Sequence, residues 1–236
     1  MRPFVLWFML FIVHPAFAQK TYKFDHLLEY EVTYFKDSLR KNSRIFRETD
    51  TTYTKIYLTH SQRNNYRAIL TELDSLTFMM DFRDYEGVTF RFKFSKSVFY
   101  ENQLFKVPCE LVRQYQNPFQ YQVKNYDFVT LTDTIVGNKS YYRYKLTSIR
   151  PKKIKRLKLA TQFYIVDKGT VEHMPLLDFP TAYEEWKTAP DLPNGLLFET
   201  YITDFYGDLD SRERLSASQT INKQIVINAP CDYSKN

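Results

Sequence analysis

The stretch Val88-Thr89-Phe90-Arg91-Phe92-Lys93-Phe94 alternates apolar and polar side chains without interruption. Successive side chains of a β-strand point to opposite faces of a sheet, so this pattern predicts a strand with one buried face and one solvated face. Residues 28–34 alternate in the same way, and residues 157–165 do so with Leu157, Leu159, Phe163 and Ile165 on the apolar side. Such alternation is typical of antiparallel sheets, because parallel sheets are covered on both faces.

Short polar connections separate these runs, at residues 61–65, 73–75, 83–87 and 136–139. Connections of this length favour hairpins, because parallel neighbours need a long crossover. Residues 59–80 have a weaker helical pattern, but their β-rich flanks favour strands. The sequence therefore predicts a mainly β fold, with a single curved antiparallel sheet or a half-open barrel of hairpin-linked strands.

One short helix is predicted near residues 181–187. Thr181 stands three residues before Glu184, the spacing of a capping box, and Pro180 and Pro190 bound the segment. The surrounding proline-rich residues 174–193 are expected to pack over the sheet as an irregular cover. No repeat or linker divides the chain, so residues 19–236 are expected to form one domain.

Residues 1–18 are typical of a signal peptide. Arg2 supplies the positive charge, residues 4–13 form an apolar run too short to span a bilayer, and Ala16-Phe17-Ala18 resembles a cleavage site. The mature chain would begin at Gln19. No other segment is long and apolar enough to cross a membrane, so the processed protein is not expected to span one.

The formal charge of +6 is concentrated in one region, because residues 134–166 contain nine Lys or Arg residues and no Asp or Glu. The densest cluster comprises Arg150, Lys152, Lys153, Lys155, Arg156 and Lys158. These residues are candidates for binding an anionic lipid or another polyanion. The alternative is a charged hairpin tip that keeps an edge strand soluble. Nucleic acid is a poor partner for an exported chain that is acidic elsewhere.

Motifs for catalysis, metals or cofactors are not found in the sequence. It has no His-Glu-x-x-His motif, no Cys-x-x-Cys and no Gly-x-Ser-x-Gly elbow, and its five glycines lie in turn-like contexts. The chain is therefore not expected to be an enzyme, and no metal or cofactor is predicted. Two alternatives remain open for Cys109 and Cys231: a disulfide formed in an oxidising compartment, or two unpaired thiols.

The apolar strand faces also allow two interpretations. Phe90, Phe92, Phe94, Phe163 and Ile165 would line a cavity for an acyl chain if the sheet curves into an open barrel. Alternatively, the same side chains fill the core, as most aromatic stripes do.

The C-terminal half resembles the GLPGLI family of bacterial envelope proteins. The resemblance lies in residues 133–138, the strands around residues 144–146 and 163–167, Met174-Pro175, and Leu192-Pro193-Asn194-Gly195-Leu196-Leu197-Phe198-Glu199. It departs from the family where Asn194 interrupts the named stretch and where Leu197 replaces the usual Ile. The resemblance implies a mainly β protein exported to the envelope of a Gram-negative bacterium, in the periplasm, at the cell surface or outside the cell. It implies no catalytic residues.

Two functions fit these observations. The first is a non-enzymatic binding or carrier-like envelope protein, with a lipid-like or peptide ligand on its concave apolar face and Lys152, Lys153, Lys155 and Arg156 contacting anionic groups. The second is a structural or interaction module that docks an envelope protein through a basic hairpin or an exposed strand edge.

Overall fold

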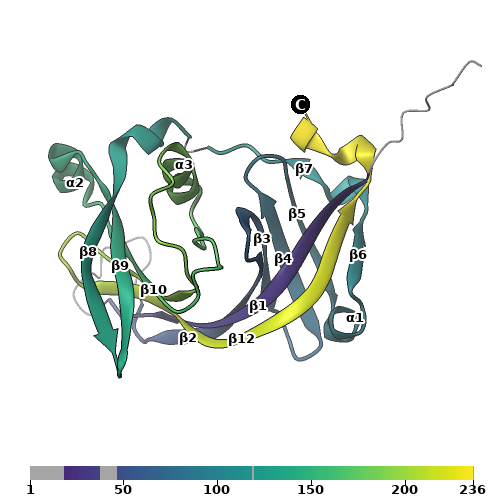
Figure 1. The fold of residues 1–236 in the computed structure, drawn as a ribbon, viewed down its shortest axis with the longest axis horizontal. Coiled ribbons are helices and arrows are strands. Elements are labelled where there is room, and N and C mark those ends of the chain that lie inside the picture. The colour runs from purple at the N-terminus through teal and green to yellow at the C-terminus, as the bar shows by residue number, and fades with distance from the viewer. Residues whose placement is uncertain (1–18, 38–46, 119, 236) are drawn as a thin grey trace, which may run out of the picture.

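The computed structural model describes residues 19–37, 47–118 and 120–235, so the predicted signal peptide lies outside the described residues. Twelve strands in this part form one open, strongly curved sheet (Figure 1). The strands are β1 (Lys20–Tyr34), β2 (Thr51–His60), β3 (Arg63–Glu72), β4 (Thr77–Asp84), β5 (Val88–Ser95), β6 (Leu104–Val107), β7 (Arg113–Gln114), β8 (Tyr126–Val136), β9 (Lys139–Ser148), β10 (Thr161–Asp167), β11 (Leu197–Thr203) and β12 (Leu209–Ile227).

The sheet order is β7-β5-β4-β3-β2-β1-β12-β11-β10-β9-β8, and every neighbouring pair in it is antiparallel. This confirms the predicted mainly β fold, including strands rather than a helix at residues 59–80. An exception to the predicted pairing is β6, which runs parallel to the end of β12. These two strands are far apart in the sequence, so no tight hairpin forces them to be antiparallel.

The described chain contains three α-helices rather than the one predicted: α1 (Lys96–Glu101), α2 (Pro151–Leu157) and α3 (Pro180–Thr188). Short 3₁₀ turns lie at η1 (Cys109–Leu111), η2 (Gln120–Asn125), η3 (Ala229–Cys231) and η4 (Tyr233–Lys235). The predicted helix corresponds to α3, but its predicted cap is wrong. Phe179 is the N-cap and makes no side-chain cap bond, while Pro180 occupies the first turn. Proline suits that position because its fixed φ is helical and its missing N–H needs no partner there.

Two hydrophobic cores lie on opposite faces of the sheet. In β2, Ile56 and Leu58 belong to one core and Tyr57, between them, belongs to the other. Adjacent residues of a strand point in opposite directions, so the two cores must be separated by the sheet itself. We call the first the Phe-rich core, after Phe24, Phe78, Phe82, Phe90, Phe99 and Phe105. We call the second the Tyr-rich core, after Tyr30, Tyr57, Tyr85, Tyr144, Tyr164 and Tyr183.

The Tyr-rich core is closed by residues 168–196, which connect β10 to β11 and include α3. We call this connection the cover. It lies inside the curve of the sheet, with α3 between the β8–β10 arm and the β3–β5 arm (Figure 1). Leu177, Ala182 and Leu192 of the cover are buried against the tyrosines. Near the end of the cover is Gly195, where an added Cβ would lie 2.4 Å from the Asp167 carbonyl oxygen. Only glycine allows this close approach.

The predicted alternation of residues 157–165 is wrong in its details. Leu157 ends α2, Lys158 adopts a left-handed conformation that terminates the helix, and β10 begins only at Thr161. Within β10, Tyr164 is buried in the Tyr-rich core. Phe163 and Ile165 therefore face the opposite side of the sheet. Gln162 and Tyr164, which were predicted to be on the solvated face, are buried, and Ile165 on the opposite face is buried as well.

Candidate functional site

The five predicted ligand-binding residues do not form one site. Phe90 is buried in the Phe-rich core, and Phe92 and Phe94 pack against it. The rings of Phe82 and Phe90 stack with centroids 4.6 Å apart, and Phe94 lies 5.8 Å from Phe105. These phenylalanines fill a core, which was the alternative interpretation.

Phe163 and Ile165 lie in the other arm, on the face of β10 turned away from the Tyr-rich core. The Phe163 ring stacks on Tyr201 of β11 with centroids 4.7 Å apart. Arg143 of β9 donates a hydrogen bond of 3.0 Å to the Tyr201 hydroxyl oxygen. The structure therefore does not bring Phe163 and Ile165 together with Phe90, Phe92 and Phe94.

An apolar cavity does lie on the concave side of the sheet, between the β8–β11 arm and the start of α3. Its volume is about 240 Å³, and its lining includes Tyr126, Leu146, Leu159, Phe179 and Ile202. Most of these side chains are hydrocarbon or aromatic, so the cavity suits an apolar group.

A second cavity lies on the other side of Phe179, against the β3–β5 arm, and has a volume of about 310 Å³. Its lining includes three arginines from neighbouring strands, Arg67 of β3, Arg83 of β4 and Arg91 of β5. Asp81 and Asp178 supply the acidic groups of the lining. Phe179 lines both cavities, so they are neighbours, and we call the two together the concave groove. Its two ends differ in chemistry, one apolar and one rich in arginine.

The three arginines of the groove have different contacts. The Arg67 guanidinium forms an ion pair with Asp178 at 2.6 Å and donates to the Leu177 carbonyl at 3.0 Å. Arg83 lies over the Tyr115 ring, 5.6 Å from its centroid. Neither Arg83 nor Arg91 forms an ion pair within the described part of the chain. Arg83 and Arg91 are therefore the arginines available to an anionic ligand.

A buried ion network holds the cover at the edge of this groove. Lys55 lies 3.2 Å from Asp178 and 2.8 Å from Glu213, and the Tyr57 hydroxyl donates to Glu213 at 2.9 Å. Burial alone would raise the pKa of Asp178, but the charges of Arg67 and Lys55 lower it to about 2. Asp178 is therefore ionised at neutral pH, and it ties the cover to β2 and β3.

A histidine cluster holds the other end of the cover. His26, His60 and His173 come from β1, β2 and the cover, and the rings of His26 and His173 are 4.2 Å apart. Asp25 accepts hydrogen bonds from the Ser61 hydroxyl at 2.6 Å and lies 2.8 Å from His26 Nδ1. A Ser-His-Asp triad needs the serine hydroxyl on the imidazole, whereas here it is on the carboxylate. The contacts therefore serve to attach the cover rather than to activate Ser61.

We expect acid to weaken this attachment. Burial and the neighbouring His26 lower the pKa of His173, although Glu172 and Asp25 act in the opposite direction. A lowered pKa means that the unfolded chain binds the proton more tightly, so stability falls as the pH drops through the unfolded value toward the folded one. The free energy of unfolding, measured by urea titration, should be lower at pH 5.5 than at pH 7.5. In His173→Gln the difference in unfolding free energy between pH 7.5 and pH 5.5 should be smaller. A difference equal to that of the unmodified protein would mean that His173 does not cause the loss of stability in acid.

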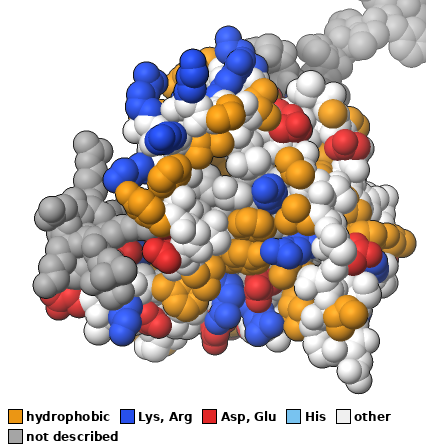
Figure 2. Space-filling view, turned by 90° about the vertical axis from the view of Figure 1, so that its left-hand side faces the viewer, with side chains coloured by type: hydrophobic (Ala, Val, Ile, Leu, Met, Phe, Trp, Pro, Cys, Tyr) orange, Lys and Arg blue, Asp and Glu red, His pale blue; other side chains and the backbone are white. Residues whose placement is uncertain are grey.

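The predicted anion-binding residues lie on α2 and its flanks, in the connection between β9 and β10. This connection is a helix rather than a hairpin tip. Arg150, Lys152, Lys155, Arg156 and Lys158 are exposed, and Lys153 is half-buried. Figure 2 shows Lys and Arg side chains gathered at the top of this face, with hydrophobic side chains among them.

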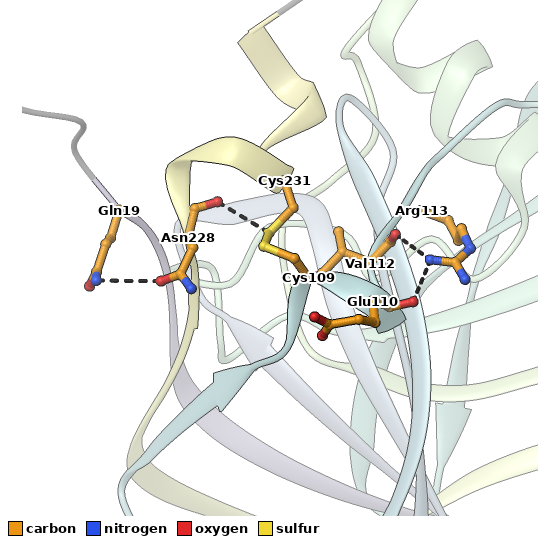
Figure 3. Close-up of a disulfide and its surroundings, with 7 residues drawn as sticks. All are labelled: Gln19, Cys109, Glu110, Val112, Arg113, Asn228 and Cys231. Carbon is orange, nitrogen blue, oxygen red and sulfur yellow. Dashed lines mark hydrogen bonds between the residues drawn. A yellow bond between two sulfur atoms is a disulfide. The ribbon is translucent and has the colours of Figure 1, made fainter.

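Cys109 and Cys231 form a disulfide with their Cα atoms 5.5 Å apart (Figure 3). Cys109 follows β6 and Cys231 follows β12, so the bond closes the end of the parallel strand pair. Arg113 donates to the Glu110 carbonyl at 2.6 Å and to the Val112 carbonyl at 2.8 Å, which fixes the turn after Cys109. The bond lies at the edge of the Phe-rich core, away from the concave groove.

Within the described ranges, no group of three or more His, Cys, Asp and Glu residues is arranged to hold a metal ion. None of the helices in this part of the chain is long and apolar enough to cross a membrane.

Comparisons with known proteins give only distant likenesses. No family model and no curated protein matches the sequence, so the GLPGLI resemblance stays a prediction. The fold is similar to MucB in the Pseudomonas aeruginosa MucA/MucB complex, with 10% identity over 83% of this chain and 52% of that chain and a TM-score of 0.36. It is also similar to a LolA superfamily protein from Nitrosomonas europaea, with 10% identity over 83% of this chain and 85% of that chain and a TM-score of 0.33. A DUF1329 family protein from Desulfovibrio piger matches with 12% identity over 83% of this chain and 85% of that chain, at a TM-score of 0.33.

The chain spans about half the length of the MucB chains that it matches. Likenesses this weak say nothing about what the chain binds.

Proposed function

We propose that the protein is a non-enzymatic binding or carrier-like module of the cell envelope, and that its concave groove holds an amphipathic ligand. The apolar part of the ligand would occupy the cavity beside Leu146 and Ile202, and an anionic group would lie between Arg83 and Arg91. The observation that carries this proposal is the meeting of the two cavities at Phe179.

Physical chemistry supports both halves of this ligand. Each methylene group moved from water into an apolar cavity contributes about 0.8 kcal/mol, which offsets part of the free-energy cost of association. A guanidinium group presents donors in a planar fork that matches carboxylate and phosphate. An amphipathic anion would satisfy both ends of the groove, whereas a purely apolar or purely ionic ligand would satisfy one.

The proposed site for the anionic group of the ligand, between Arg83 and Arg91, is not the one that the sequence predicted. Lys152, Lys153, Lys155 and Arg156 were expected to contact it, but they lie on α2 and not among the groove residues. Export to the envelope remains part of the proposal. It depends on the predicted signal peptide, residues 1–18, which lies outside the described residues.

A pair of matched probes tests the proposal: a fluorescent fatty acid with a chain of medium length, which matches the cavity of about 240 Å³, and its methyl ester. We expect the purified protein to bind the acid more tightly than the ester. In Arg83→Gln/Arg91→Gln the affinity for the acid should fall roughly tenfold, because two partly exposed charge contacts of about 0.7 kcal/mol each are lost, and the affinity for the ester should not change. Lys106→Gln, an exposed substitution on β6, is the control and should bind both probes as the unmodified protein does.

Equal binding of acid and ester, or no binding of either, would reject the proposal. Native mass spectrometry of the protein purified from its own host, followed by lipid extraction, would then show whether any ligand accompanies it.

A second candidate function, docking of an envelope protein along a strand edge, is favoured by β8. This strand is last in the sheet order and has 11 residues, with Val129 38% and Ile135 73% exposed. Long exposed edges readily pair with another chain. Pull-down of a partner from envelope fractions, lost when Ile135 is changed to Lys, would favour this function over ligand carriage.

A further inference from the structure

The helix α2 carries an unusual concentration of uncompensated charge. Six of the nine residues from Arg150 to Lys158 are Lys or Arg. No ion pair involves any of them within the described part of the chain, and Lys158 instead lies over the Tyr206 ring at 5.2 Å. The stretch from residue 134 to 166 contains no Asp or Glu that would balance these charges.

The exposed side of α2 combines these charges with apolar side chains. Lys152, Lys155 and Arg156 are neighbours at helical spacing and are all exposed. Leu157, the last residue of the helix, is 50% exposed, and Ile149, just before the helix, is 49% exposed. Like charges on adjacent turns repel each other, so the folded protein gains nothing from this arrangement by itself. Basic residues on one face of a helix and exposed apolar side chains elsewhere on it are typical of a helix that lies in the interface of an anionic membrane.

We propose that α2 docks the protein on the surface of an anionic lipid bilayer, with Lys and Arg contacting headgroups and Leu157 entering the interface. The position of α2 supports this occupant. Leu159 and Ala160, which follow the helix directly, line the apolar cavity of the concave groove. Docking through α2 therefore places the rim of that cavity against the lipid. Outside residues 134–166, acidic residues outnumber basic ones after Gln19, so residues 134–166 carry all of the net positive charge of the chain from that point on.

The test of this inference is separate from the test of the proposed ligand, because the substituted residues lie on α2 and not among the groove arginines. The test is co-sedimentation of the purified protein with vesicles of phosphatidylglycerol and phosphatidylcholine, and with vesicles of phosphatidylcholine alone. We expect binding to the anionic vesicles only, and its loss at high salt. Each basic residue near an anionic surface strengthens partitioning roughly fivefold, so Lys152→Gln/Lys155→Gln should lower it roughly twenty-five-fold.

The matched control is Lys23→Gln/Lys106→Gln, which removes the same net charge. Lys23 near the start of β1 and Lys106 of β6 both pair with the end of β12, and β6 lies at the opposite end of the molecule from α2 (Figure 1). Both control lysines are exposed, as Lys152 and Lys155 are, so neither variant should alter the fold. The control should bind anionic vesicles within twofold of the unmodified protein. An equal loss in both variants would mean that overall charge, not α2, drives binding, and would overturn the proposal.

A second measurement distinguishes a bilayer from a soluble polyanion. Leu157→Trp should show a blue-shifted tryptophan emission on adding anionic vesicles and no shift with phosphatidylcholine vesicles or with heparin. Tight binding to heparin with no emission shift on vesicles would identify a general polyanion site. That outcome would also overturn the membrane assignment.

Discussion

Reduction of the Cys109–Cys231 bond is expected to lower the free energy of unfolding by about 4–5 kcal/mol. The two cysteines are 122 residues apart in the sequence, so the bond closes a long loop and strongly restricts the unfolded chain. It also joins the ends of β6 and β12, which pair in parallel. No hairpin connects these two strands. The measurement is urea unfolding of the same protein with and without a reductant.

The double variant Cys109→Ala/Cys231→Ala serves as the control. It should be about as unstable as the reduced protein, and reductant should not change it further. Cys231 is 2% exposed, so its replacement removes some packing as well, and the comparison with and without reductant in the unmodified protein is the cleaner one. A difference below about 1 kcal/mol between the oxidised and reduced protein would show that the strand pair holds without the bond.

Much of the fold is predictable from local patterns. The alternation in residues 88–94 and the short turns around them predict antiparallel hairpins, and β2, β3, β4 and β5 form them. What the pattern cannot predict is the pairing of β6 with β12, because that contact joins distant segments. The helix α2 was missed for a different reason: Leu157 and Leu159 extend the period-two pattern, while Pro151 and the left-handed Lys158 bound a helix there.

The candidate site was missed because the apolar residues were taken as the candidates. Phe90, Phe92 and Phe94 do share a face, but that face is a filled core. The intervening Arg91 faces the concave groove, where the cover lies against the other side of the sheet. The alternation correctly predicts which residues share a face of the sheet. The prediction that the polar face is solvated does not follow from the alternation itself. Only the placement of the cover, a tertiary feature, shows that the polar face lines a cavity.

The largest single-substitution effect is expected at Asp178. Changing Asp178 to Ala leaves Arg67, whose side chain is 5% exposed, without its carboxylate partner. Removing one partner of a buried ion pair costs about 3–5 kcal/mol, because the remaining charge stays desolvated. Asp178 is partly exposed, so we expect the lower end of this range, about 3 kcal/mol, by urea unfolding at pH 7. The matched control Asp191→Ala removes an exposed acid of the same cover, and should change stability by about 0.5 kcal/mol at most.

The pH dependence separates loss of charge from loss of packing at Asp178. Because Arg67 and Lys55 lower its pKa below the ordinary value, the unfolded chain takes up the proton first as the pH falls. The stability that the carboxylate contributes is therefore complete above the unfolded pKa and is lost as the pH falls through the folded one. The difference in unfolding free energy between the unmodified protein and Asp178→Ala should narrow between pH 5 and pH 2. A difference that stays constant over this range would mean that Asp178 acts through packing alone, and that the ion network does not hold the cover over the concave groove.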